Sequence, residues 1–324
     1  MSQSAARAVS PAVPPPCSQR AGQPASRRFR MLGRLGTHLA IGFLKLLALL
    51  PYGVTARFGD GLGWLLYQIP SRRKRIVHTN LKLCFPDWSD ERREEVAGQH
   101  FRHAIRSYVE RSYQWFASEE AYRKLFTIDS EIDLSDPDMP PTLLLGLHFV
   151  GIEAGSMALN LALDRPCGSL YTPMKNPEID AAAKAGRSRF GAELAGRADS
   201  ARIVLRWLRD RKPVMLGADM DYGLRNSTFV PFFGVPACTL TAVGRLAKTG
   251  RAQVVPFIGE VLPNYKGYRL KVFKPWDHYP TGDDDLDARR MNEFLEQQIP
   301  LMPEQYYWVH KRFKTRPPGE PSLY

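Results

Sequence analysis

The pattern of apolar and polar positions divides the chain into a helical first part and a second part that mixes strands with helices. Before residue 140 the apolar residues recur at helical spacing, most clearly from Ser89 to about Phe116. Ser89 is placed to cap this helix, because acidic residues follow it in the first turn. After residue 140, short apolar runs alternate with helical segments. The alternation predicts an α/β fold with a central sheet flanked by helices.

The elements of the second part are expected at regular intervals, without an internal repeat. The sequence predicts strands at 142–149, 168–172, 213–218, 252–259 and 268–273. It predicts helices near 151–163, 178–190, 199–210, 239–249 and 284–299. The run Phe229–Phe233 is unusually apolar, so it is either ordinary core or a loop near a cleft that suits a hydrocarbon chain.

The first part of the chain also carries membrane signals. Residues 1–30 are rich in Ala, Ser and Pro and are expected to be a disordered extension, which makes Met31 a candidate natural start. The apolar stretch 32–50 holds only ten uncharged residues between Arg34 and Lys45, fewer than the ~20 that span a bilayer. It predicts an interfacial anchoring helix or a tilted span. A cleaved signal peptide is disfavoured, because no small-x-small cleavage site follows.

Charge agrees with a membrane-facing role. The formal net charge is +12, and the first 30 residues contribute five arginines and no acid, so the remainder keeps an excess of seven. Such a charge suits nucleic acid, an anionic membrane surface, or acidic proteins and lipids. Nucleic acid is excluded, because no paired Cys/His spacing and no aromatic-basic strand signature is present. The four scattered cysteines form neither a disulfide framework nor a zinc motif, which indicates a reducing compartment.

A histidine at the end of an apolar run carries the strongest chemical signal. His148 ends the run that begins at Leu143, and Glu153 follows five positions later. On one continuous helix their side chains would point about 140° apart. They meet if His148 ends a strand and Glu153 lies in the first turn of the next helix. A carboxylate that orients a histidine is typical of a general base acting on a hydroxyl, although a purely structural histidine is the alternative.

A second acidic run follows another apolar strand. Asp219 and Asp221 come after the strand predicted at 213–218. Ligands bind beyond the carboxyl ends of strands in α/β sheets, so His148 and Asp219 are expected to converge on one cleft. The Asp-x-Asp run could hold a divalent cation, but an ion pair between Asp219 and Arg187 is favoured.

Taken together, these motifs resemble the bacterial lipid A biosynthesis acyltransferases. These are the late lauroyl and myristoyl transferases of the lysophospholipid acyltransferase superfamily, and the resemblance covers Met31 to Gly319. Glu153 stands where the wider superfamily usually has Asp. The resemblance is carried by His148-x4-Glu153, the run Asp219–Gly223, the run Phe229–Phe233 and the tail from Pro303 to Pro317, with Asn80 to Pro86 and Val255 to Ile258 as weaker matches.

The resemblance implies an acyl-carrier-protein-dependent O-acyltransferase with a lysophospholipid-acyltransferase-like mixed sheet. It implies transfer of a fatty acyl chain to a hydroxyl of a Kdo-linked lipid A precursor at the cytoplasmic face of the inner membrane. His148 would be the general base and Glu153 the carboxylate that orients it, with no cofactor and no metal. Substrate binding is inferred for Arg187, Asp219, Asp221, Tyr222 and Arg312.

Basic side chains are candidates for contacts with the acidic carrier protein and with the phosphates and carboxylates of the acceptor. These are Arg72, Arg73, Arg75, Lys311, Arg312, Lys314 and Arg316. The expected organisation is a disordered extension at 1–30, a membrane-anchoring helical segment at 31–70, an acyltransferase domain at 71–319 and a tail at 320–324. The rival functions are acylation of another membrane lipid, such as a glycerophospholipid or an aminolipid, and non-catalytic binding at a membrane surface.

Overall fold

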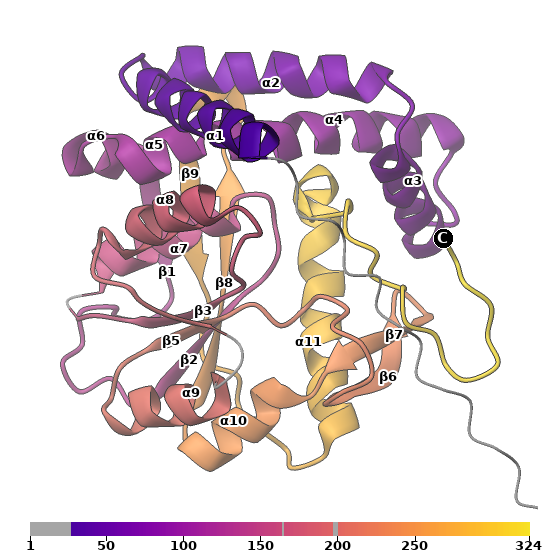
Figure 1. Ribbon diagram of the computed structural model, residues 1–324. Helices are drawn as coiled ribbons and strands as arrows, with labels where there is room; N and C mark the ends of the chain where they lie inside the picture. Colours follow the sequence, from indigo (N-terminus) through magenta and orange to yellow (C-terminus); the bar gives the residue numbers. More distant parts are fainter. Residues whose placement is uncertain (1–26, 164, 197–199) are drawn as a thin grey trace, which may run out of the picture.

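A seven-stranded mixed sheet forms the centre of the molecule (Figure 1). The computed structural model describes residues 27–163, 165–196 and 200–324. The strand order is β1-β9-β8-β2-β5-β3-β4. Neighbours from β8 to β4 run parallel, whereas β9 is antiparallel to β8 and parallel to β1. The strands are β1 (Phe126–Ser130), β2 (Thr142–Gly146), β3 (Gly168–Tyr171), β4 (Glu193–Gly196), β5 (Val214–Leu216), β8 (Gln253–Val261) and β9 (Tyr268–Val272).

Helices cover both faces of the central strand β2, which is buried along its whole length. Leu143 and Leu145 pack with residues of α9, α10 and α11, whereas Leu144 packs with residues of α7 on the other side. Successive side chains of a strand point to opposite faces, so a run of leucines is what a doubly covered strand requires. The helices after β2 are α7 (Ile152–Ala162), α8 (Pro177–Ser188), α9 (Ser200–Arg209), α10 (Ala242–Gly250) and α11 (Asp284–Gln298).

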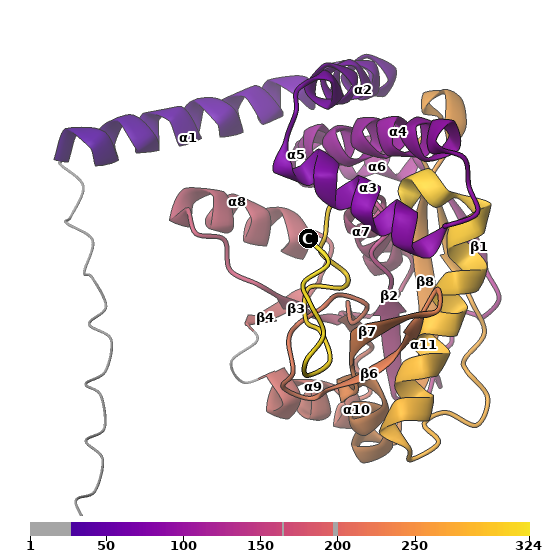
Figure 2. The same cartoon turned by 90° about the vertical axis from the view of Figure 1, so that its right-hand side faces the viewer.

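A layer of helices from the first part of the chain lies over one end of the sheet (Figures 1 and 2). α2 and α4 cross so closely that a Cβ atom at Gly63 would lie 2.6 Å from the Cα atom of Arg102. Ser89 caps α4 as predicted, its hydroxyl accepting from the backbone N–H of Arg92. The single helix expected up to Phe116 is interrupted at Glu110. These helices are α1 (Arg27–Leu47), α2 (Tyr52–Gln68), α3 (Arg72–Cys84), α4 (Asp90–Val109), α5 (Arg111–Phe116) and α6 (Glu119–Arg123).

A buried polar cluster joins this helical layer to the sheet. Arg106 Nε donates to Glu110 Oε1 over 2.6 Å, and both side chains are almost fully buried. The hydroxyl of Tyr52 in α2 donates to the same oxygen over 2.7 Å, and the hydroxyl of Tyr268 in β9 donates to Glu110 Oε2. Breaking such a buried pair leaves an uncompensated charge, so the cluster fixes the helices on the sheet.

The expected anchoring segment is helical, and α1 extends past α8 at the edge of the body (Figure 2). Within the described residues, no helix combines the length and the apolar character needed to cross a bilayer. The predicted extension, residues 1–30, lies outside the described residues except for its last four, which belong to α1.

The apolar run from Phe229 to Phe233 is not a loop beside the cleft. It lies in a hairpin formed by β6 (Ser227–Phe232) and β7 (Val235–Leu240), turned at Phe233 and Gly234 with positive φ values of 48° and 76°. Two positive φ values suit the tight turns that match strand twist. The hairpin packs on α11, where Asn292 Nδ2 donates to the carbonyl of Pro231 over 2.8 Å. Its apolar side chains therefore belong to the core.

Candidate active site

Two adjacent parallel strands bring His148 and Asp219 together. β2 and β5 are paired in register at Leu145 and Leu216, so their carboxyl ends meet at one edge of the sheet. His148 follows the end of β2, and Asp219 follows the end of β5. The two residues meet as predicted, but only His148 lines the cavity, because Asp219 is fully buried.

Asp219 is the carboxylate that holds the imidazole. His148 Nδ1 donates to Asp219 Oδ1 over 2.5 Å, and the backbone N–H of His148 donates to Asp219 Oδ2 over 3.0 Å. The two bonds fix both the ring and its backbone. Since Nδ1 carries the proton toward Asp219, Nε2 is left as the acceptor.

Electrostatics keep Asp219 ionised. Its side chain is fully buried, which by itself raises the pKa of the carboxyl. The charge of His148 and the hydrogen bonds from its ring and backbone outweigh burial, so the pKa of Asp219 lies below its ordinary value. An ionised carboxylate at this position stabilises the imidazolium that forms when His148 takes a proton.

A glycine makes room for the imidazole. Gly217 follows β5, and a Cβ atom at this position would lie 2.7 Å from Cε1 of His148 and 3.2 Å from Nε2. A separation of 2.7 Å is too short for a real carbon contact, so any side chain at Gly217 displaces the ring. The same backbone accepts a hydrogen bond at its carbonyl from the Tyr222 hydroxyl over 3.0 Å.

The carboxy-terminal tail holds the turn that carries His148. The backbone N–H of Tyr307 donates to the carbonyl of His148 over 2.9 Å, and that of Val150 donates to the carbonyl of Gln305 over 2.7 Å. Phe149 and Tyr306 form an isolated antiparallel bridge, with their rings edge to face at 5.7 Å. The tail motif therefore positions the histidine through backbone contacts.

Glu153 does not pair with His148, contrary to the prediction. It lies in the first turn of α7 as expected, but its carboxylate accepts from Arg187 Nε at 2.7 Å and from Arg187 Nη2 at 2.6 Å. Trp115 Nε1 donates to the same carboxylate over 3.2 Å. The predicted ion pair between Asp219 and Arg187 is also wrong, because Arg187 is bonded to Glu153 and Asp219 is bonded to His148. The first turn of α7 faces the last turn of α8 and helix α5, whereas the ring of His148 turns toward β5.

The Glu153–Arg187 pair is also charged. Burial raises the pKa of Glu153, but the hydrogen bonds and charge of Arg187, with a smaller contribution from Arg111, hold that pKa below its ordinary value. Burial lowers the pKa of Arg187, and the bonds and charge of Glu153 reverse the effect and raise it. Two parallel N–H···O bonds between a guanidinium and a carboxylate are the strongest form of such a pair.

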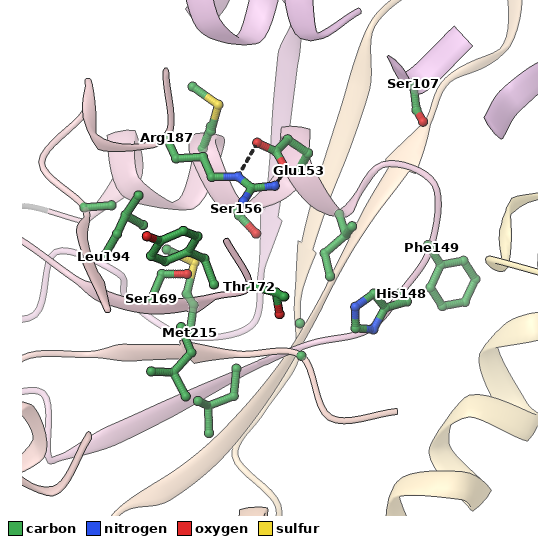
Figure 3. Close-up of a pocket in the computed structure, with 18 of the residues that line it drawn as sticks. Ser107, His148, Phe149, Glu153, Ser156, Ser169, Thr172, Arg187, Leu194 and Met215 are labelled. Atoms are coloured by element: carbon green, nitrogen blue, oxygen red, sulfur yellow. Dashed lines mark hydrogen bonds and ion pairs between the residues drawn. The ribbon is translucent and has the colours of Figure 1, made fainter. Parts of the chain in front are cut away.

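His148, Glu153 and Arg187 line one cavity of about 340 Å³, whereas Asp219 is fully buried and reaches it only through the ring of His148. Figure 3 shows the Glu153–Arg187 pair with Ser156 beside it, and His148 in a separate part of the lining. The volume falls within the range of about 300–1,000 Å³ that is typical of small-molecule sites. The rest of the wall combines hydroxyl and amide groups, including those of Ser156, Asn160 and Thr172, with apolar side chains. The apolar residues are Phe149, Val150, Ile152, Met157, Leu170, Met174, Ala192, Leu194, Met215, Leu216 and Phe257.

Two predicted substrate-binding residues are structural instead. Arg312 is 1% exposed and donates to the carbonyl of Cys238, to Thr239 Oγ1 and to Asn292 Oδ1 at 2.9–3.0 Å. It holds the tail against β7 and α11. A guanidinium with these contacts lies inside the core, so it does not reach a substrate.

Asp221 is the other structural residue. Its carboxylate accepts from the backbone N–H of Thr315 at 2.6 Å and from the Thr315 hydroxyl at 2.8 Å. The described residues contain no cluster of three or more His, Cys, Asp or Glu side chains that could hold a metal ion. Tyr222 lies outside the cavity lining, although its hydroxyl braces Gly217.

Several of the predicted basic contacts also have partners within the chain. Arg73 donates to the carbonyl of Val309 over 2.7 Å, and Lys314 lies 3.7 Å from Asp221. Arg316 donates to the carbonyl of Pro236 over 2.6 Å. Contacts with the carrier protein or the acceptor remain predictions.

Four residues of the site were not identified from the sequence. Trp115 and Arg111 sit among helical aromatics that indicate core, and Tyr307 lies in a tail whose contacts are long-range. Gly217 offered a hint, because a glycine between a buried strand and an acidic run often marks a close approach.

Comparison with known proteins shows the family to which this chain is similar. Residues 23–315 match the family described as bacterial lipid A biosynthesis acyltransferase. The lipid A biosynthesis lauroyltransferase of Escherichia coli K12 is 36% identical over 291 residues, covering 89% of this chain and 94% of that protein. The palmitoleoyltransferase of the same strain is 33% identical with the same coverage. Its myristoyltransferase is 32% identical over 266 residues, or 78% of each chain.

Proposed function

Because this chain belongs to the bacterial lipid A biosynthesis acyltransferase family, we propose that it moves a fatty acyl group from acyl carrier protein to a hydroxyl of a Kdo-linked lipid A precursor. The chain is a transferase of lipid A biosynthesis that acts at the late acylation stage. The observation that carries the finer proposal is the His148–Asp219 pair, whose histidine lines a cavity with a partly apolar wall. A base for a hydroxyl then lies beside room for a hydrocarbon chain.

The reaction needs one base and one good leaving group. Nε2 of His148 removes the proton of the acceptor hydroxyl while the oxygen attacks the thioester carbonyl. The tetrahedral intermediate then collapses, the C–S bond breaks, and the imidazolium returns its proton to the departing thiolate. Asp219 holds the ring in the required tautomer and stabilises its positive charge through the 2.5 Å bond. A thioester is already activated, so these residues supply the main chemistry.

We assign the apolar wall of the cavity to the acyl chain. Met157, Leu194 and Met215 are among its side chains. Flexible methionines fill and adapt to irregular apolar space, which suits a chain with many conformers. Burying each methylene of the donor in this wall contributes about 0.8 kcal/mol.

In this proposal the Glu153–Arg187 pair positions the substrate rather than the base. Glu153 engages Arg187 through Nε and Nη2, and among the described residues Nη1 has no acceptor, so it is the donor offered to a substrate oxygen. Both residues line the cavity. The pair is therefore placed to orient the acyl thioester or the acceptor near His148.

The exposed apolar face of α1 and α2 is our proposed membrane surface at the cytoplasmic side of the inner membrane. Phe43 and Phe58 join the two helices, with ring centroids 5.9 Å apart. The exposed arginines at the start of α3 suit anionic headgroups. Most of the exposed large apolar residues lie here: Leu35, Leu39, Phe43, Leu46, Leu49, Leu50, Val54, Phe58, Trp64, Leu65, Leu66 and Ile69. Replacing Phe43 and Trp64 by Asp should abolish co-sedimentation with anionic vesicles without altering circular dichroism, and unchanged binding would contradict the assignment.

Mass spectrometry of the product tests the enzymatic proposal. Purified protein is incubated with the lipid A precursor and with acyl carrier protein loaded with C12 or C14 chains. We expect a mass gain of one acyl group, absent with His148→Ala and retained with Arg123→Gln, an exposed arginine of α6. No gain with any donor, from protein shown to be folded, contradicts the proposal. A gain on a glycerophospholipid alone would favour the rival acceptor class.

A further inference from the structure

Arg111 is a charged residue of the cavity that the reaction scheme does not use. It begins α5 and lines the cavity with Ser107 and Tyr108, which precede it by one helical turn. Its guanidinium carbon lies 4.3 Å from the centre of the Tyr108 ring and 5.6 Å from that of Trp115. Tyr108 is 43% exposed, and its hydroxyl bonds to that of Tyr307 over 2.7 Å. These aromatic rings hold Arg111 where the cavity opens to solvent.

Arg111 lacks the partners that neighbouring arginines have. Arg106 pairs with Glu110, and Arg187 pairs with Glu153. Within the described part of the chain, Arg111 has no ion pair, and its buried Nε atom has no hydrogen-bond acceptor. A buried donor without an acceptor is costly, and buried polar groups in native proteins are nearly always bonded. An unbonded guanidinium against a cavity therefore indicates an acceptor that arrives with a ligand.

Charge balance points in the same direction. The charges of Glu153 and Arg187 cancel, so Arg111 is the remaining full charge among the lining side chains, while the carboxylate of Asp219 lies outside the lining and is bonded to His148. The reacting groups, a thioester carbonyl and a hydroxyl, are neutral. The positive charge of Arg111 therefore matches an anionic group elsewhere on a substrate.

We propose that Arg111 is an anion-binding residue that takes a phosphate group of a substrate at the mouth of the catalytic cavity. The inference rests on the proposed function and names a binding contact within it. A guanidinium offers a planar fork of donors that matches phosphate oxygens, and its stacking on Tyr108 fixes the plane of that fork. Two sources share this chemistry, namely a phosphate of the acceptor lipid and the phosphodiester of the pantetheine arm of the carrier protein.

The competing role for a cavity arginine is stabilisation of the oxyanion of the tetrahedral intermediate. The two roles differ in what they change. A phosphate contact is made in the ground state and in the transition state alike, so its loss raises KM with little change in kcat. An oxyanion contact is made only in the transition state, so its loss lowers kcat.

The experiment compares Arg111→Met and Arg111→Lys with the wild type. Methionine keeps an apolar stem against Tyr108, and lysine keeps the charge without the fork. Arg123→Gln serves as the matched control, because Arg123 is an exposed arginine outside the cavity. KM is measured for the lipid A precursor before and after phosphatase treatment, and for acyl carrier protein against an acyl-pantetheine thioester that lacks phosphate. KM does not depend on the fraction of folded enzyme, so partial unfolding does not mimic the effect.

We expect Arg111→Met to raise one KM by about ten-fold to one-hundred-fold, with Arg111→Lys in between. If the rise is confined to the phosphorylated acceptor, the acceptor supplies the phosphate. If it is confined to acyl carrier protein, the pantetheine arm supplies it. Unchanged KM values, a rise that persists on the phosphate-free substrates, or a loss in kcat alone would overturn the inference. An inactive wild-type enzyme would instead count against the proposed function.

Discussion

The two side-chain pairs at the cavity stand on different parts of the fold. His148 and Asp219 stand on the ends of adjacent parallel strands, and their side chains are joined by one bond of 2.5 Å and braced by a second from the backbone. Glu153 and Arg187 stand on two helices and meet through two parallel bonds. The strand-based pair is fixed by sheet register, whereas the helix-based pair depends on how α7 and α8 pack. The reactive histidine therefore stands where the register of two paired strands fixes its geometry.

Of the substitutions that distinguish the two pairs, Asp219→Asn is expected to lower kcat the most. The carboxylate accepts from both the ring and the backbone of His148, and an amide accepts with only one of its two atoms. The imidazole is then no longer held in the tautomer with its proton on Nδ1, and we expect kcat to fall by about 10²–10⁴-fold. Steady-state acyl transfer measures the loss, with circular dichroism as the control for folding. A fall of less than ten-fold would show that Asp219 is not the partner that matters.

Gly217→Ala tests the strand-based pair without changing a charge. The added Cβ would approach Cε1 of His148 to 2.7 Å, so the ring must turn away from Asp219. A displacement of this size from a catalytic geometry costs up to about one-hundred-fold in rate. We expect kcat to fall by about ten-fold to one-hundred-fold with an unchanged thermal midpoint. Gly196→Ala is a suitable control, because no atom of the described residues lies within 4 Å of a Cβ at Gly196.

Glu153→Gln tests the helix-based pair. The amide still accepts from one Arg187 nitrogen but no longer balances its charge. We expect about a ten-fold loss in activity, expressed more in KM than in kcat, and a lower thermal midpoint. A loss as large as that of Asp219→Asn, confined to kcat, would restore Glu153 as the partner of the base.

Lowering the pH is expected to have the smallest effect, a loss in the free energy of unfolding that can be assigned to individual side chains. Burial lowers the pKa of His100 to about 3, although its bond to the Glu304 carbonyl opposes the shift. The unfolded chain binds the proton first, so stability falls as pH drops through about 6.5 toward the folded value. Asp219 and Glu153 act in a different pH range. Because their pKa values are lowered in the folded protein, the stability that they contribute is lost only below about pH 4. Urea unfolding at pH 7 and pH 5 should therefore show a loss that His100→Gln reduces and that Glu153→Gln leaves unchanged.

The sheet and its edge were predictable from local pattern. The strands and helices expected after residue 140 are all present with ends shifted by a few residues, because apolar runs of strand length are distinct from helical spacing. β1 and β4 were missed, since both are edge strands with few buried residues. The hairpin at Phe229 was missed as well, because its turn uses the backbone freedom of Gly234 without a typical turn dipeptide.

The partners within the site were less predictable. Sequence spacing placed Glu153 in the first turn of a helix, but spacing does not give the rotation of that helix against α8 and α5. The bond between His148 and Asp219 spans 71 positions, and it depends on β2 and β5 being neighbours. Arg312 looked like an exposed basic residue in a basic tail, yet long-range packing buries it. Contacts of this kind depend on tertiary arrangement, which periodicity does not contain.

Nuclear magnetic resonance of the histidine ring protons tests the central claim most directly. Enzyme with ¹⁵N-labelled histidine is compared as the wild type, Asp219→Asn and Glu153→Gln, with His148→Gln used to assign the signal. Our account predicts a strongly downfield Nδ1–H resonance for His148 that disappears in Asp219→Asn and persists in Glu153→Gln. Loss of that resonance in Glu153→Gln, with its survival in Asp219→Asn, would contradict the account.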